Sequence, residues 1–238
     1  MHWEQALRFK PDFAEAHNNL GNALMKLDRL QQAIDHYEQA LRIRPDYAEA
    51  QYDLGNALLQ VGRLQEAMEH WEQTLRLKPD SAEAHNNLGN ALMEQGKLPE
   101  AIGHFEQTLR IKPDDAAAHF NLGIASTRLG RVPEAIGHYE QAVRLKPDYA
   151  EAQYNLGNAF LQVGRLQDAM EHWEQTLRLR PGFAEAYNNL GIALFEQGRQ
   201  QEAVRHFEQA LRIKPELAAA RNALARLRAT QPPGTGSR

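Results

Sequence analysis

The chain has 238 residues, of which 27 are basic and 31 acidic, and its formal net charge is -4. This balance argues against nucleic acid as a partner, because nucleic-acid-binding domains carry a strongly basic face. The absence of cysteine excludes disulfides, thiolate metal sites and thiol nucleophiles, and it fits a reducing, cytoplasmic location. No apolar run approaches the roughly 18 residues of a membrane span, so we expect neither a membrane segment nor a signal peptide.

A period of 34 residues runs through the whole sequence. It is marked by the prolines Pro11, Pro45, Pro79, Pro113, Pro147, Pro181 and Pro215. The same spacing gives a glycine column of Gly21, Gly55, Gly89, Gly123, Gly157 and Gly191, and an aromatic column of Trp3, Tyr37, Trp71, Phe105, Tyr139, Trp173 and Phe207. A period of this length indicates one supersecondary unit stacked many times.

The predicted elements follow this period in chain order. Residues 1–13 are expected to form the second helix of a truncated repeat. Six full repeats then occupy 14–47, 48–81, 82–115, 116–149, 150–183 and 184–217. Residues 218–230 are predicted as a capping-type helix, on which Leu224 and Leu227 are expected to stay exposed, and residues 231–238 as a disordered tail.

Each repeat carries two amphipathic helical patterns with apolar residues spaced by three and four. Asp12 and Glu15 have the spacing of a capping box, which predicts an aspartate N-cap for the first helix, and the spacing recurs in later repeats. The short turn holds Gly62, Gly96, Gly130, Gly164 or Gly198, with Asp28 in the first repeat, and a positive φ is expected there. Pro99 and Pro133 are expected in the first turn of second helices.

The repeat resembles the tetratricopeptide repeat. The matching residues in the first full repeat are Leu20, Gly21, Ala33, Tyr37, Ala40 and Pro45. The resemblance implies an all-α, right-handed superhelical solenoid of antiparallel helix hairpins, with the first helices lining a concave groove. The large aromatic residue expected at repeat position 4 is absent. The Asn-Leu-Gly-Asn motif is also similar to the repeats of O-linked N-acetylglucosamine transferases.

The repeat positions that the resemblance places in the groove are rich in asparagine, a poor helix former. A carboxamide offers one acceptor and two donors, which match the main chain of an extended peptide. The candidate peptide-binding residues are Asn18, Asn19, Asn22, Tyr52, Asn56, Asn86, Asn87, Asn90, Phe120, Asn121, Tyr154, Asn155, Asn158, Asn188 and Asn189. The alternative is that some asparagines only tie adjacent repeats together.

Other functional classes find little support. The carboxylate clamp, another use of this family, needs cations at groove positions that hold none in the six full repeats. The histidine column from His2 to His206 repeats about 10 Å apart if helices stack normally, too far for two residues to share an ion. We expect no metal, no cofactor and no enzymatic activity, because no catalytic constellation converges.

The repeats are not equally alike. Repeats 48–81 and 150–183 are identical at 28 of 34 positions, whereas repeat 116–149 departs most, with Phe120 in place of a polar groove residue. The sequence predicts a scaffold that binds a protein or an extended peptide. A substrate-recognition arm of an O-glycosyltransferase and an engineered or consensus-like array without a native ligand stay open as alternatives. Homo-association through exposed terminal helices is also expected.

Overall fold

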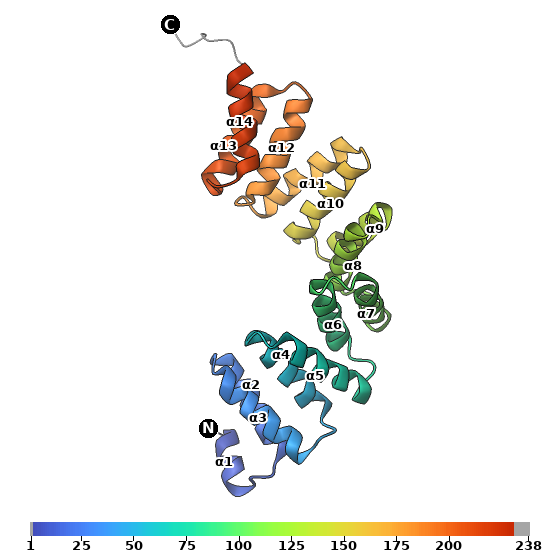
Figure 1. The fold of residues 1–238 in the computed structure, drawn as a ribbon, viewed down its shortest axis with the longest axis vertical. Helices are drawn as coiled ribbons and strands as arrows, with labels where there is room; N and C mark the ends of the chain where they lie inside the picture. Colours follow the sequence, from blue (N-terminus) through green and yellow to red (C-terminus); the bar gives the residue numbers. More distant parts are fainter. Residues whose placement is uncertain (1, 231–238) are drawn as a thin grey trace. The chain divides into compact units, whose positions relative to one another are not determined.

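The computed structural model describes residues 2–230, and every regular element in that range is an α-helix. The helices follow one another along the chain in the order that Figure 1 labels. They are α1 (His2–Phe9), α2 (Ala14–Lys26), α3 (Leu30–Ile43), α4 (Ala48–Gln60), α5 (Leu64–Leu77), α6 (Ala82–Glu94), α7 (Leu98–Ile111), α8 (Ala116–Arg128), α9 (Val132–Leu145), α10 (Ala150–Gln162), α11 (Leu166–Leu179), α12 (Ala184–Glu196), α13 (Gln200–Ile213) and α14 (Ala218–Thr230).

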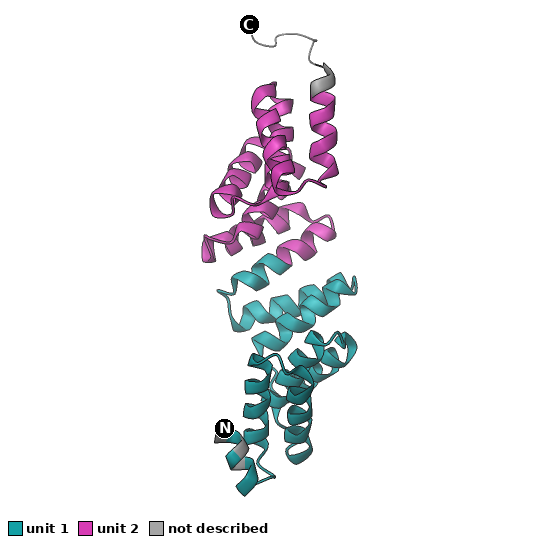
Figure 2. Cartoon of the chain, turned by 90° about the vertical axis from the view of Figure 1, so that its left-hand side faces the viewer, with its two compact units in different colours: residues 1–121 teal, residues 122–238 magenta. Residues whose placement is uncertain are grey.

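The chain divides into two compact units, residues 1–121 and 122–238, which Figure 2 shows in teal and magenta. In the first unit α2 packs on α3, α4 on α5 and α6 on α7, and each second helix also packs on the first helix of the next hairpin. In the second unit α10 packs on α11 and α12 on α13, and α14 covers α13. Each unit is therefore a stack of helix hairpins, which confirms the predicted all-α solenoid class.

The glycine and aromatic columns close each hairpin. A Cβ atom built on Gly21 would lie 2.5 Å from Cε1 of Tyr37, and the same clash recurs at the later glycines of the column. Since no side chain fits there, the ring lies directly against the backbone of the first helix. Ala33 and Tyr37 on the second helix are almost completely buried, so this contact forms the core of the hairpin.

The turns between the two helices match the sequence prediction. The glycines at these turns all adopt positive φ angles, between 73° and 79°, and Asp28 replaces them in the first full repeat with a φ of 57°. Aspartate tolerates this left-handed region better than most residues with a side chain. Pro99 and Pro133 lie in the first turn of α7 and α9, as predicted.

The predicted capping boxes are wrong. The N-cap of α2 is Phe13 rather than Asp12, and α4 likewise begins after Tyr47, neither with a side-chain capping bond. The chain makes a turn after each proline, which moves the helix start one residue further along. The aromatic residue at that place lies against the preceding cation, as in Arg44 over the Tyr47 ring at 3.5 Å. A side chain does cap α6, where Ser81 accepts from the backbone N–H of Ala84 at 3.3 Å.

The first and last described helices differ in exposure. On α14, Leu224 and Leu227 are buried, so the expectation that they remain exposed is wrong. On α1, Trp3 is 40% and Phe9 is 90% exposed. The predicted tail, residues 231–238, lies outside the described residues. No helix in the described range is long and apolar enough to cross a membrane.

Candidate functional site

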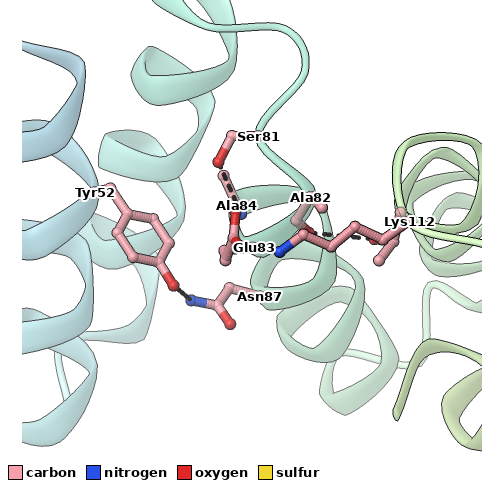
Figure 3. Close-up of polar contacts among 8 residues, drawn as sticks. Tyr52, Ser81, Ala82, Glu83, Ala84, Asn87 and Lys112 are labelled. Atoms are coloured by element: carbon pink, nitrogen blue, oxygen red, sulfur yellow. Dashed lines mark hydrogen bonds and ion pairs between the residues drawn. The ribbon is translucent and has the colours of Figure 1, made fainter. Parts of the chain in front are cut away.

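A ladder of polar side chains joins the first helices of successive hairpins. Asn87 on α6 donates through Nδ2 to Oδ1 of Asn56 at 2.9 Å and to the hydroxyl oxygen of Tyr52 at 3.4 Å, both on α4. Figure 3 shows the Tyr52 hydroxyl directed at the Asn87 amide. Oδ1 of Asn56 also accepts from Nε1 of the buried Trp71 at 3.1 Å. This rung thus connects a buried side chain of one hairpin to the first helix of the next.

The same rung recurs along the chain. Asn121 donates to Asn90 at 2.8 Å and to Asn86 at 3.3 Å. The equivalent rung of the second unit runs from Asn189 to Asn158 at 3.0 Å and to Tyr154 at 3.3 Å. Part of the predicted groove chemistry is therefore used to tie adjacent repeats together.

These bonds leave some hydrogen-bonding groups of the ladder unused. Within the described residues, Oδ1 of Asn87 accepts no hydrogen bond and the Asn56 carboxamide donates none. Both residues are half-buried. Because a carboxamide has one acceptor and two donors, each rung keeps capacity for a further partner.

The first rung is built differently because it contains an acid. Asp53 takes the place of the bridging asparagine, and its Oδ2 accepts from Nδ2 of Asn18 and of Asn22, both at 3.0 Å. A carboxylate only accepts hydrogen bonds, so Asn18 turns its amide nitrogen towards Asp53. Oδ1 of Asn18 is then buried without a partner. Burial raises the pKa of the Asp53 carboxyl and nearby Glu49 adds to the rise, against the two amide bonds that lower it.

A cavity of about 350 Å³ opens beside this rung in the first unit. Its lining residues are Asn18, Asn19, Asn22, Tyr47, Ala48, Glu49, Tyr52, Asp53, Thr74, Lys78, Ser81 and Glu83. Four of these residues were predicted, namely Asn18, Asn19, Asn22 and Tyr52. The other eight were not among the predicted site residues, and they include Asp53 on α4, Lys78 after α5 and Ser81 before α6. The differences between the nearly identical repeats 48–81 and 150–183 could have pointed to Asp53, Lys78 and Ser81, which all lie at positions where the two repeats differ.

The charges around the cavity are unevenly balanced. Glu83 forms an ion pair with Lys112, which Figure 3 shows, and this contact lowers the pKa of the Glu83 carboxyl. Lys78 lies close enough to lower it further. Among the described residues, Asp53, Glu49 and Lys78 form no ion pair. Two carboxylates of the cavity are thus left without a paired cation.

Two smaller hollows lie on the same faces of the hairpins. One, of about 60 Å³, is lined by Asn87, Asn90 and Leu59 among others, all in the first unit. The other, of about 50 Å³, lies in the second unit and includes Asn189 and Ile192. Both hollows combine carboxamide and apolar side chains with one glutamate.

The remaining predicted residues are placed as follows. Asn155 on α10 hydrogen-bonds Tyr139 on α9, so it contributes to a contact between successive hairpins. Asn188 donates to Oδ1 of Asn189 at 3.3 Å, and its own Oδ1 is buried without a partner. Phe120 lies half-buried on α8 and lines none of the hollows above.

Histidines pair between the two helices of a hairpin, which the sequence analysis did not foresee. Nδ1 of His85 lies 3.0 Å from Nδ1 of His104, and Nε2 of His85 lies 3.1 Å from the Pro79 carbonyl oxygen. Since a carbonyl only accepts, Nε2 of His85 donates to Pro79, and Nδ1 of a neutral His85 then accepts from Nδ1 of His104. Burial, with a contribution from His85, lowers the pKa of His104. In the part of the chain that the structure describes, no group of three or more potential ligands could hold a metal.

Fold and site together define a class: an all-α helix-hairpin repeat protein whose first helices carry carboxamide ladders. Family models agree with this class. The model described as tetratricopeptide repeat matches residues 52–116, 90–150, 120–175 and 154–218, and a TPR repeat model matches 2–28 and 21–62. The chain therefore belongs to the tetratricopeptide repeat family, whose stacked repeats form extended binding surfaces.

Solved structures give the same result. A MamA structure is 28% identical, with a TM-score of 0.64, and the match covers 69% of this chain and 96% of that one. YrrB, described as a TPR protein with an unusual peptide-binding site, is 22% identical, with a TM-score of 0.68 and coverage of 78% and 96%. Pseudomonas aeruginosa PilF is 19% identical, with a TM-score of 0.78 and coverage of 90% and 97%. A search of curated proteins finds no match.

Proposed function

We propose that this chain is a protein-interaction scaffold that binds an extended peptide segment along its carboxamide ladders. The observation that carries the proposal is the partly used amide at each rung, exemplified by Asn87, whose nitrogen is bonded between hairpins and whose oxygen is not. A peptide main chain presents alternating donors and acceptors, so it can bond to such amides in succession.

Two further observations support the proposal. Some of the amides line a hollow between one hairpin and the first helix of the next, and this hollow also contains apolar side chains such as Leu59. One structural neighbour, YrrB, is described as having a peptide-binding site. Because the carboxamides would hydrogen-bond the main chain of the peptide, we expect the affinity to depend only modestly on the peptide sequence. A non-catalytic role fits this arrangement, and the similarity to O-glycosyltransferase repeats stays a prediction.

A neutral probe tests the proposal directly. A fluorescein-labelled peptide of alternating serine and glutamine is titrated with the protein, and its anisotropy is followed. We expect saturable binding that weakens about fivefold in Asn19→Ala, since one lost hydrogen bond is worth about 1 kcal/mol. Asn19 suits this test because it lines the cavity and forms no hydrogen bond within the described residues, so removing its amide leaves the ladder intact.

The control is Gln31→Ala, which removes a carboxamide from the exposed side of α3, where Gln31 bonds only Asp35. That variant should bind like the unmodified chain. No saturable binding of the probe, or equal weakening in both variants, would contradict binding at the carboxamide faces.

A further inference from the structure

The cavity of the first unit indicates the chemistry of a ligand more specifically than the ladder as a whole does. Resting on the proposed function, we propose that this cavity selects a cationic side chain, lysine or arginine, of the bound segment, and that Asp53 is the residue that pairs with it.

Asp53 presents an unused acceptor to the cavity. Both of its amide donors, Asn18 and Asn22, bond to Oδ2, and within the described residues Oδ1 accepts no hydrogen bond. Asn18 also lines the cavity, is only 4% exposed, and has a buried Oδ1 without a partner. Because Oδ1 of Asn18 is closed to solvent, Oδ1 of Asp53 is the acceptor that this rung offers to a ligand. Ammonium and guanidinium groups only donate, so either would satisfy that acceptor.

The charges of the lining favour a cation over an anion. Glu83 is already compensated by Lys112, and Lys78 lies near it. The carboxylates of Glu49 and Asp53 repel each other, and neither has a paired cation in the described part of the chain. A ligand cation placed between them would make charge-assisted hydrogen bonds, which are stronger than neutral ones. The ring of Tyr52 also lines the cavity and offers a face that attracts cations.

The matching repeat in the second unit shows that these features are local. Repeats 48–81 and 150–183 differ at six positions, and three of the differing residues of the first, Asp53, Lys78 and Ser81, line the cavity. Their counterparts are Asn155, Arg180 and Phe183.

The consequences of these three differences are visible in the structure. The Phe183 ring packs on Tyr154 with centroids 4.7 Å apart, whereas Ser81 has no ring to place against Tyr52, and both residues line the cavity. Arg180 pairs with Glu151, whereas Lys78 forms no such pair with Glu49. In the second unit, therefore, a ring lies against Tyr154 and Glu151 has a paired cation. At the equivalent place in the first unit there is a cavity with two unpaired carboxylates, Glu49 and Asp53.

The test uses three labelled peptides in which serine alternates with lysine, glutamine or glutamate. With the unmodified chain we expect the lysine peptide to bind roughly tenfold more tightly than the glutamine peptide, and the glutamate peptide to bind most weakly. In Asp53→Asn the lysine peptide should fall to the level of the glutamine peptide. Ser81→Phe should weaken all three, because the ring would occupy the cavity.

Both substitutions copy residues that the chain itself carries at 155 and 183, so the hairpin is expected to fold. Asp46→Asn, on an exposed turn outside the cavity, controls for the overall negative charge and should leave the preference unchanged. Equal binding of all three peptides, or a preference that survives Asp53→Asn, would overturn the cation selection and leave the proposed function standing. Tighter binding of the glutamate peptide would point to Lys78 and also overturn it. If no peptide binds, the proposed function fails as well.

Discussion

At the scale of single residues, the direction of each hydrogen bond decides what a rung can do. Asn121 donates to two acceptors, whereas Asp53 at the same repeat position accepts from two donors. This reversal costs stability twice. It buries part of a carboxylate, and it leaves Oδ1 of Asn18 without a partner. Buried unsatisfied acceptors cost about 1–3 kcal/mol, so the first rung is retained at the expense of stability.

The first prediction follows from this cost. Asp53→Asn should raise the free energy of unfolding at neutral pH by about 1 kcal/mol, because Asn18 can then turn over and accept a hydrogen bond. The pKa of Asp53 is raised in the folded chain, so the folded state holds its proton more tightly than the unfolded state. The carboxylate therefore destabilises the fold increasingly as pH rises above the ordinary aspartate value of about 3.9.

Urea denaturation at a series of pH values checks this prediction. The gain in Asp53→Asn should be greatest near neutral pH and should shrink as the pH approaches about 4. Asp46→Asn, at an exposed turn, should show little gain at any pH. A gain of the same size at every pH would assign the effect to packing instead of charge.

At the scale of helices and hairpins, the glycine column makes the closest contact of the fold. A Cβ built on Gly89 would lie 2.6 Å from Cε1 of Phe105, which is fully buried between the two helices. The ring cannot move without disturbing the core of the hairpin. We predict that Gly89→Ala lowers the free energy of unfolding by about 1–3 kcal/mol.

The same hairpin supplies the control for this substitution. Gly103 lies on α7, and a Cβ there would meet no atom within 4 Å. Gly103→Ala should stabilise the helix by about 0.5–1 kcal/mol, because alanine loses less backbone entropy than glycine. Opposite signs for the two variants in thermal or urea unfolding would confirm that the contact with Phe105, and not helix propensity, requires glycine at position 89. Stabilisation by both would refute it.

The elements also show what the sequence could and could not predict. The turn glycines were predictable because a positive φ is a property of the local backbone, as Gly62 confirms. The helix N-caps were not, because Asp12 has the right chemistry but the turn after Pro11 moves the helix start to Phe13. A capping pattern therefore depends on backbone geometry that residue types alone do not report.

At the scale of the whole molecule, the 34-residue period made the fold predictable from the sequence. The same regularity drew attention away from the residues of the proposed cavity. A row of carboxamides could be predicted because asparagine recurs at the same repeat positions, although Asp53 takes its place in the first rung. The cavity could not, because it depends on where one repeat departs from its counterpart. Ser81 contributes by being small, and Lys78 and Glu83 reach it from the end of α5 and the start of α6. Such a site arises from the stacking of hairpins, which single positions in a repeat do not reveal.

Self-association is the last property that belongs to the whole molecule. Trp3 and Phe9 on α1 are 40% and 90% exposed, and exposed aromatic rings favour burial against another surface. We predict that the chain associates with a second copy through α1 as its concentration rises from micromolar to millimolar. Light scattering over that range should show an increasing mean mass, and the increase should vanish in a Trp3→Gln and Phe9→Ser double variant. Phe195→Ser, which removes another exposed ring at the far end of α12, should leave the increase unchanged. A constant mass at all concentrations would refute the association, and a loss of association in Phe195→Ser alone would place the contact on α12 instead.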